Sequence, residues 1–245
     1  GSYIRRKCRI MLKIKNLHWW VWKIDILKSV DFNVKKWEAI WIVWPNWSWK
    51  TSLLNVINGF NIQNKWEIIL EWNNIENIST QKRALKWIWR VFQSSWIFKE
   101  LTLFENLALS YTSRLSFYYK FLPLKFLPKN IKNEIHDSLK ELHLYDKINN
   151  KASDLSWWQM RLLEIARLYL QDTKIYLLDE PTAWVSPKLK WIVSKLIKKI
   201  LKKWKIVIIV EHDFSWLWDF VDRLIVMDDW KIVLDWKYNQ IKNNN

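Results

Sequence analysis

Short apolar runs separated by turn positions dominate the first third of the chain. Their length and β-branched content are typical of strands, which we expect at 12–14, 29–34 and Ala39–Val43 and again between 66 and 92. After the third run the pattern changes, because apolar residues recur at helical spacing from 52 to 58. The order strand, loop, helix is therefore predicted for this stretch.

The rest of the chain is predicted to be helical first and then to alternate strands with a helix. Leucines at helical spacing among charged residues extend over about 100–170, with an aromatic, proline-containing insertion at 111–128. The runs at 175–178 and Ile206–Val210 are continuously apolar, which is typical of parallel strands buried on both faces. These patterns predict an α/β protein with a parallel sheet.

The loop between the third strand and its helix has the spacing of a phosphate-binding loop. It reads Trp44, Pro45, Asn46, Trp47, Ser48, Trp49, Lys50, Thr51, and Ser52 follows. With glycine in place of each tryptophan it becomes GPNGSGKT, in the strand–helix setting that the motif requires. In such a loop backbone N–H groups surround phosphate oxygens, Lys50 reaches the β- and γ-phosphates, and Thr51 offers a hydroxyl to Mg²⁺. Three indoles here are expected to obstruct a nucleotide.

Tryptophan stands where glycine is expected throughout the chain. There are 22 Trp and 2 Gly in 245 residues, whereas glycine averages about 7%. Trp37 and Trp66 occupy turn contexts, and Asp229-Trp230 and Asp235-Trp236 resemble Asp-Gly hairpin turns, which favour positive φ. We interpret this exchange as a codon that the organism reads as glycine, as happens when UGA is decoded under the wrong genetic code. The alternative is a Trp-bearing, non-catalytic interaction domain.

Charge and hydropathy exclude several classes of protein. The formal net charge is +16, but the lysines are spread along the chain, so we expect no nucleic-acid partner. No apolar run approaches the roughly 20 residues of a membrane helix, and the single cysteine, Cys8, excludes a disulfide framework. Met11 is a candidate start, so residues 1–10 are expected to be a leader and 239–245 a polar tail.

Polar residues follow the two late apolar runs. Asp179 and Glu180 close the first, and His212 comes just after the second. In open α/β sheets, active groups gather at the carboxyl ends of parallel strands. Asp179 is therefore predicted to hold Mg²⁺, Glu180 to position and deprotonate an attacking water, and His212 to contact the γ-phosphate.

With glycine at the tryptophan positions, the chain resembles the ATP-binding-cassette (ABC) ATPases over residues 12–238. The family's motifs appear in family order: the loop at 44–51, Gln93, the LSGGQ signature at 155–159, Asp179-Glu180, the D-loop at 183–186 and His212. The signature is unique to this family among phosphate-loop proteins. The resemblance implies an α/β phosphate-loop (P-loop NTPase) core, with an antiparallel β subdomain and a helical subdomain at about 95–165.

The resemblance also implies ATP and Mg²⁺ as cofactors and a head-to-tail dimer that encloses two ATP molecules. The nucleotide would be bound by residues 44–52 and Gln93 of one subunit and, from the other, by Ser156, Trp157, Trp158 and Gln159, with glycine at 157 and 158. Thr51, Gln93 and Asp179 would hold the metal, and Glu180 and His212 would be catalytic. The dimer, a homodimer or a pair of paralogous ATPases, would dock on transmembrane permease subunits at the cytoplasmic face of the cell membrane.

Smaller details favour one subfamily. The segments 162–167, 179–187 and 211–213 resemble ATPases that import branched-chain amino acids or urea, and lipopolysaccharide-export ATPases share part of this pattern. The alternative class is a soluble cassette protein that acts on ribosomes or DNA. One cassette and no long coiled-coil arm argue against that class.

Overall fold

The computed structural model describes residues 10–21, 24–44, 50–60, 67–92, 96–111, 124–171, 173–183, 185, 187–213, 215–237 and 240. The strands are β1 Ile10–Val21, β2 Ile24–Lys35, β3 Ala39–Val43, β4 Glu67–Leu70, β5 Asn73–Asn74, β6 Ile88–Val91, β7 Ile175–Asp179, β8 Ile206–Val210, β9 Arg223–Asp228 and β10 Lys231–Lys237. The helices are α1 Lys50–Asn58, α2 Thr80–Lys86, α3 Leu103–Ala108, α5 Lys129–Glu141, α6 Trp157–Leu170 and α7 Pro187–Lys202, with 3₁₀ turns at Leu109–Tyr111, Leu124–Phe126, Tyr145–Lys147 and Ala152–Asp154.

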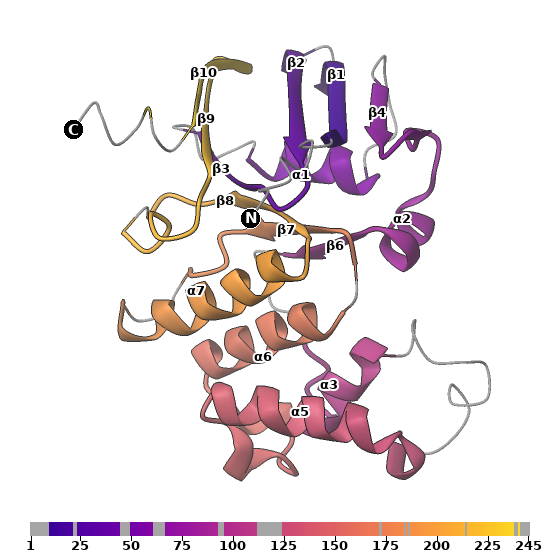
Figure 1. Ribbon diagram of the computed structural model, residues 1–245, viewed down its shortest axis with the longest axis vertical. Coiled ribbons are helices and arrows are strands. Elements are labelled where there is room, and N and C mark those ends of the chain that lie inside the picture. The colour runs from indigo at the N-terminus through magenta and orange to yellow at the C-terminus, as the bar shows by residue number, and fades with distance from the viewer. Residues whose placement is uncertain are drawn as a thin grey trace, which may run out of the picture.

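Two sheets form the upper and middle layers in Figure 1. The mixed sheet has the order β10-β9-β3-β8-β7-β6, in which only β10 runs antiparallel to its neighbour. The antiparallel sheet has the order β2-β1-β4-β5 and lies above β8, β7 and β6, with β10 of the mixed sheet beside β2 (Figure 1). Helices α6 and α7 lie below the mixed sheet, with α3 and α5 beneath them. The predicted α/β core with an antiparallel β subdomain and a helical subdomain is confirmed.

Side chains alternate strictly between the two faces of the mixed sheet. Ile206, Ile208 and Val210 of β8 join the apolar cluster that α1 and the antiparallel sheet share. Val207 and Ile209 join a second cluster, with α3, α5, α6 and α7. Because both faces are covered by apolar elements, the strand is apolar throughout, as the sequence predicts.

Helix α1 is held between the two sheets by its apolar face. Leu53, Leu54, Val56 and Ile57 are at most 1% exposed, and burial of each such side chain contributes about 1.5–3 kcal/mol. The helix begins at Lys50, shortly after the end of β3. This packing orients the N-terminus of α1 toward the carboxyl edge of the mixed sheet.

On the other face, Tyr176 of β7 is a buried polar anchor. Its ring is 1% exposed and its hydroxyl donates a 2.6 Å hydrogen bond to the carbonyl oxygen of Gln171. Gln171 caps the C-terminus of α6. The tyrosine therefore ties the end of α6 to the mixed sheet.

The structure differs from the sequence prediction in three places. Strands β1 and β2 are each 12 residues long, much longer than the apolar runs at 12–14 and 29–34. Helix α2 falls inside 66–92, which was predicted as strands only. The predicted turn at 234–237 is wrong, because Asp235 and Trp236 pair with β9 inside β10.

Several tryptophans adopt the backbone conformation of glycine. Trp37, Trp204 and Trp230 have φ values of 66°, 71° and 71°. Asp229 and Trp230, with φ of 39° and 71°, form the two-residue connection between β9 and β10, and two positive φ angles are typical of a type I′ turn. The hairpin predicted at 228–231 is therefore confirmed, in a geometry that disfavours a bulky side chain.

Candidate functional site

The predicted polar residues meet at the carboxyl edge of the mixed sheet. Asp179 is the last residue of β7 and pairs with Val210, the last residue of β8. Val210 also pairs with Ile42 of β3. Because the three parallel strands end in register, the start of α1, the Asp179-Glu180 pair and His212 share one edge. This is where open α/β sheets bind their ligands.

Asp179 is buried in an ion pair. Its Oδ2 accepts a 2.8 Å hydrogen bond from Nη2 of Arg90, and the two side chains are 3% and 1% exposed. Arg90 also donates to Oδ1 of Asn55 on α1, and its guanidinium lies 4.8 Å from the centre of the Phe92 ring. Burial lowers the pKa of Arg90, while Asp179 opposes that shift. Arg90 thus links β6, β7 and α1 and holds the aspartate at this edge.

The donor set at Asp179 fits Mg²⁺ in a nucleotide site. This ion takes oxygen ligands, usually one or two carboxylates together with phosphate and water oxygens. Within the described residues no three His, Cys, Asp or Glu side chains gather to form a closed metal site. A metal here would therefore combine Asp179 with hydroxyl and phosphate oxygens. The side chain of Thr51 and the whole of Gln93, its predicted partners, lie outside what the structure describes.

Glu180 is strained and points at His212. Its φ is 45°, a left-handed value that costs an ordinary residue about 1–3 kcal/mol. Two hydrogen bonds hold this backbone: its N–H donates to Val210 (2.9 Å) and its carbonyl accepts from Arg161 (2.9 Å). Its Oε1 lies 3.2 Å from Nε2 of His212. The predicted base and the predicted γ-phosphate contact are therefore neighbours.

Glu211 is a second buried carboxylate that was not predicted as a site residue. Its Oε1 accepts from the hydroxyl and the backbone N–H of Thr182, and its Oε2 accepts from the N–H of His212 at 3.1 Å. Burial raises the pKa of Glu211 to about 7. The hydrogen bonds from Thr182 act in the opposite direction and lower this pKa, whereas the negative charge of Glu180 raises it further. Glu211 thus joins the turn after β7 to the turn after β8.

The shifted pKa of Glu211 predicts a pH-dependent stability. A carboxyl group whose pKa is raised in the folded state loses stabilising free energy as the pH increases from its unfolded value of 4.5 to its folded value of about 7. The free energy of unfolding should fall by about 3 kcal/mol at most over that window. Glu211→Gln, which does not titrate, should lack this contribution. Urea unfolding of both proteins between pH 5 and 8 measures the difference, and parallel profiles would contradict the prediction.

The signature segment forms the exposed N-terminus of α6. Ser156 precedes the helix, and its N–H and hydroxyl both donate to Oε1 of Gln159, at 3.0 and 3.1 Å. Trp157 is 45% exposed, whereas Trp158 packs partly against the helical cluster. An exposed helix N-terminus attracts anions, as the predicted contact with a second subunit's nucleotide requires.

The phosphate loop is only partly described. Pro45, Asn46, Trp47, Ser48 and Trp49 lie outside the described residues, and Lys50 and Thr51 are placed only as the first residues of α1. Ser52 is buried in that helix. Trp44 is 2% exposed, and its ring meets that of Trp230 edge-on at 5.7 Å. This side chain therefore fills the apolar core, and the prediction that the loop indoles obstruct a nucleotide then rests on Trp47 and Trp49.

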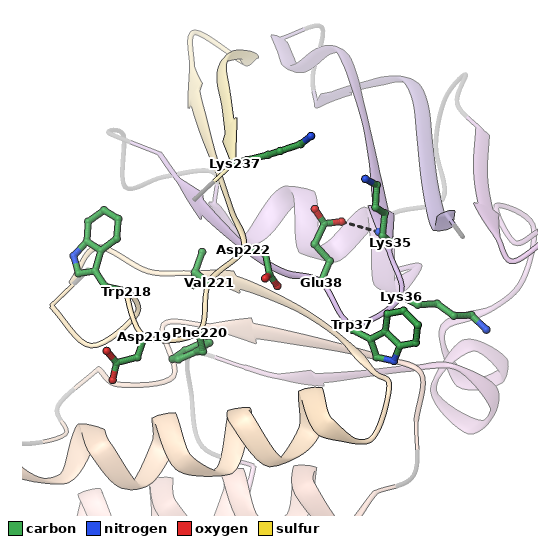
Figure 2. A pocket seen from close by; sticks show the side chains of 10 residues that line it. All are labelled: Lys35, Lys36, Trp37, Glu38, Trp218, Asp219, Phe220, Val221, Asp222 and Lys237. Atoms are coloured by element: carbon green, nitrogen blue, oxygen red, sulfur yellow. Dashed lines mark hydrogen bonds between the residues drawn. The ribbon is translucent and has the colours of Figure 1, made fainter. Parts of the chain in front are cut away.

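A cavity of about 850 Å³ lies at the opposite edge of the sheet. Figure 2 shows Glu38, Asp222 and Lys237 around it, between the turn after β2 and the segment before β9. Oδ2 of Asp222 accepts from the N–H of Ala39, the first residue of β3. This cavity is therefore at the amino ends of the strands, away from the predicted site.

A smaller groove of about 310 Å³ lies beside the site, between the core and the helical subdomain. We call it the aromatic groove; its lining includes Phe60, Phe92, Trp96, Phe98, Arg90, Glu164 and Arg167. The rings of Phe92 and Trp96 stack at 5.2 Å, and Arg167 lies 5.3 Å from the Phe98 ring. Phe60, Trp96 and Phe98 are each more than half exposed. The groove is thus an exposed apolar surface next to Asp179.

The sequence profile of the family described as ABC transporter matches residues 27–183, well over half of the chain. The chain belongs to the ABC transporter family. The matched segment contains the loop, the signature and the Asp179-Glu180 pair. No described helix of this ABC protein is long and apolar enough to span a membrane.

Individual relatives agree with this assignment. The ABC protein is 30% identical over 240 residues to a probable branched-chain amino acid transport ATP-binding protein of Methanocaldococcus jannaschii, covering 95% of this chain and 92% of that one. It is also 30% identical to a spermidine/putrescine import ATP-binding protein of Clostridium novyi, but it spans only 60% of that protein. A crystal structure of an ATP-binding cassette in its ADP conformation superimposes with a TM-score of 0.79 at 28% identity, covering 96% and 94% of the two chains.

Proposed function

We propose that the glycine-bearing form of this chain is the ATP-hydrolysing subunit of an ABC transporter, working as a head-to-tail dimer. The observation that carries the proposal is the arrangement of two half-sites on one subunit. The start of α1, Asp179, Glu180 and His212 share the edge of the mixed sheet, and the signature segment stands exposed at the start of α6. Two copies placed head to tail would complete two nucleotide sites.

The chemistry follows from the geometry at Glu180. Its carboxylate would take the proton of the water that attacks the γ-phosphorus while the bond to ADP breaks, and His212, 3.2 Å away, would contact the γ-phosphate. Asp179, fixed by Arg90, would be a ligand of Mg²⁺. When bound, Mg²⁺ neutralises charge on the phosphate oxygens. Gln93, Thr51 and Lys50 remain proposed ligands from the sequence alone.

Glycine at most of the tryptophan positions is part of this proposal. Trp37, Trp204 and Trp230 have φ values near 70°, which glycine adopts freely and which make a bulky residue an outlier. Trp72 is 76% exposed and Trp191 is 53% exposed, so they contribute little to the core. Peptide mass spectrometry of the protein from its natural source tests this. A peptide spanning 157–158 whose mass matches two tryptophans would refute the proposal.

The relatives favour import of branched-chain amino acids. The chain spans 92% of the branched-chain amino acid protein but 60% of the spermidine/putrescine protein at the same identity, so its length matches the first type. We propose leucine-like amino acids as the transported class, with urea as the alternative. Uptake of each by vesicles that contain the assembled transporter distinguishes the two.

The aromatic groove is the proposed docking site for a transmembrane subunit. It presents Phe60 and Phe98, which do not depend on the tryptophan positions, to solvent, and exposed aromatic side chains mark protein interfaces. It adjoins Asp179 through Arg90, which lines the groove and pairs with that carboxylate. An apolar helix end of a permease subunit fits such a surface. Most of the insertion at 111–128 lies outside the described residues, so its proposed part in docking rests on sequence.

Replacement of Phe98 by Ala should weaken recovery of the membrane partner by about tenfold, because loss of an aromatic anchor at an interface costs 1–2 kcal/mol or more. ATP binding should be unaffected. Tyr145→Ala is the control, since Tyr145 is an exposed aromatic residue (37%) of the helical subdomain and lies outside both the groove and the insertion at 111–128. Co-purification from membranes with each variant measures the effect. Recovery of ribosomes or DNA, with no membrane protein, would support the soluble class instead.

A further inference from the structure

Arg161 uses its whole guanidinium to join three segments of the chain. It stands on α6, five residues after Ser156, and is 2% exposed. From there it donates to the carbonyls of Asp179 (3.1 Å), Glu180 (2.9 Å) and Pro181 (3.2 Å), at and just beyond the end of β7. It also donates to the carbonyl of Phe92 at 2.6 Å, just beyond β6.

Glu164 completes this arrangement from the next turn of α6. Its Oε2 accepts a 2.8 Å bond from Nη1 of Arg161, and its Oε1 accepts from the N–H of Trp96 at 3.4 Å. Burial raises the pKa of Glu164, while Arg161 opposes the rise. Phe92 and Trp96 flank residues 93–95, so the pair holds the backbone on both sides of that segment.

We propose that Arg161 and Glu164 form a positioning joint that makes the signature end of α6 move together with the end of β7 and with the backbone flanking residues 93–95. This rests on the proposed function, because the coupled ends are its two half-sites. Arg161 touches no nucleotide; it acts through the backbone of Asp179 and Glu180. The five N–H groups of the Arg161 guanidinium bind Glu164 on α6, the carbonyls of residues 179–181 and the carbonyl of Phe92. A shift of the start of α6 therefore displaces the end of β7, and a shift of the end of β7 displaces the start of α6.

Arg83 is a second buried arginine that binds backbone carbonyls but does not connect the two half-sites. It is 1% exposed and donates to four backbone carbonyls, those of Val56, Ile57, Glu76 and Ile78. Those bonds link α2 to the end of α1 and reach neither α6 nor β7. The two arginines therefore match in burial and in bonding but differ in what they connect.

The first test uses the nucleotide-free protein and the variants Arg161→Lys and Arg83→Lys. Lysine keeps the charge, but it cannot bridge several carbonyls as the planar guanidinium does. Arg161→Lys should raise amide hydrogen exchange at 96–101 and 179–183 as well as at the start of α6. Arg83→Lys should raise exchange only near α1 and α2. If Arg161→Lys raised amide exchange in α6 alone, the proposal that Arg161 couples α6 to the end of β7 would be wrong.

The second test uses the glycine-bearing protein in a Glu180→Gln background, with ATP binding and ATP-induced dimerisation measured separately. Arg161→Lys should leave the ATP Kd within about threefold and weaken the dimer by about tenfold or more, equivalent to at least 1.4 kcal/mol. Arg83→Lys should change neither. If the parent dimerises and Arg161→Lys dimerises equally well, the inference is wrong. If the parent itself binds no ATP, the proposed function fails, and hydrogen exchange still decides the joint.

Discussion

Glu180→Gln in the glycine-bearing protein is expected to reduce ATP turnover by about 10²–10⁴, the usual contribution of a positioned general base. The amide can keep the 3.2 Å approach of the Glu180 side chain to Nε2 of His212, but it cannot accept the proton of water. Nucleotide binding should survive, because Lys50 and the loop backbone are unchanged. The dimer should then accumulate with ATP bound. Steady-state phosphate release and light scattering measure the two effects.

Two further variants make this prediction specific. Asp213→Asn removes a neighbouring carboxylate that pairs with Lys190, outside the proposed machinery, and it should hydrolyse ATP near the parent rate. Lys50→Ala should instead weaken nucleotide binding, since it removes the cation facing the β- and γ-phosphates. Near-normal hydrolysis by Glu180→Gln would show that another group activates the water.

The second large effect concerns the loop itself. A chain with Trp at 44, 47 and 49 should bind ATP at least about 10³-fold more weakly than one with glycine there, because several charge-assisted backbone contacts of about 1.5–3 kcal/mol each are lost. Since Trp44 is buried against Trp230, the obstruction is assigned to Trp47 and Trp49. Glycine at 47 and 49 alone should therefore recover most of the binding, as titration calorimetry would measure.

Trp37→Gly is the matched control for the loop variants. Trp37 has a φ of 66°, its ring meets that of Trp204 at 4.4 Å, and it precedes β3, whereas the loop follows the other end of that strand. The change should alter stability without altering ATP affinity. Micromolar ATP binding by the protein with all three loop tryptophans would refute the prediction.

The sequence predicts the buried parallel strands well and the peripheral elements poorly. Strands β3 and β8 match their predicted bounds because both faces are buried and every position is apolar. Helix α2 was missed because it has only seven residues, and its buried member is Arg83 rather than an apolar residue. The hairpin at 228–231 was predicted from its Asp-Trp pair, but the similar pair at 235–236 continues a strand. Ladder pairing with β9 overrides the local turn preference there.

The candidate site shows the same division. Asp179, Glu180 and His212 were predicted because strand ends converge in a parallel sheet. Arg90, Arg161 and Glu211 were missed, since their partners are mostly backbone groups or residues distant in sequence. A run of apolar residues that ends in a carboxylate can be recognised in a sequence. An arginine that binds backbone carbonyls cannot, because its partners follow no fixed sequence spacing. The positive φ of Glu180 likewise could not be predicted, because glutamate is not a residue that favours this conformation.

The buried ring of Tyr176 becomes a useful spectroscopic probe if glycine stands at all 22 tryptophan positions. The natural protein would then have no indole, and its near-ultraviolet signals would come from its 8 tyrosines and 10 phenylalanines. Tyr176 is 1% exposed and hydrogen-bonded to the end of α6. Its ring would therefore sit in a fixed, asymmetric environment. Near-ultraviolet circular dichroism would follow the docking of the helical layer onto the sheet without an added label.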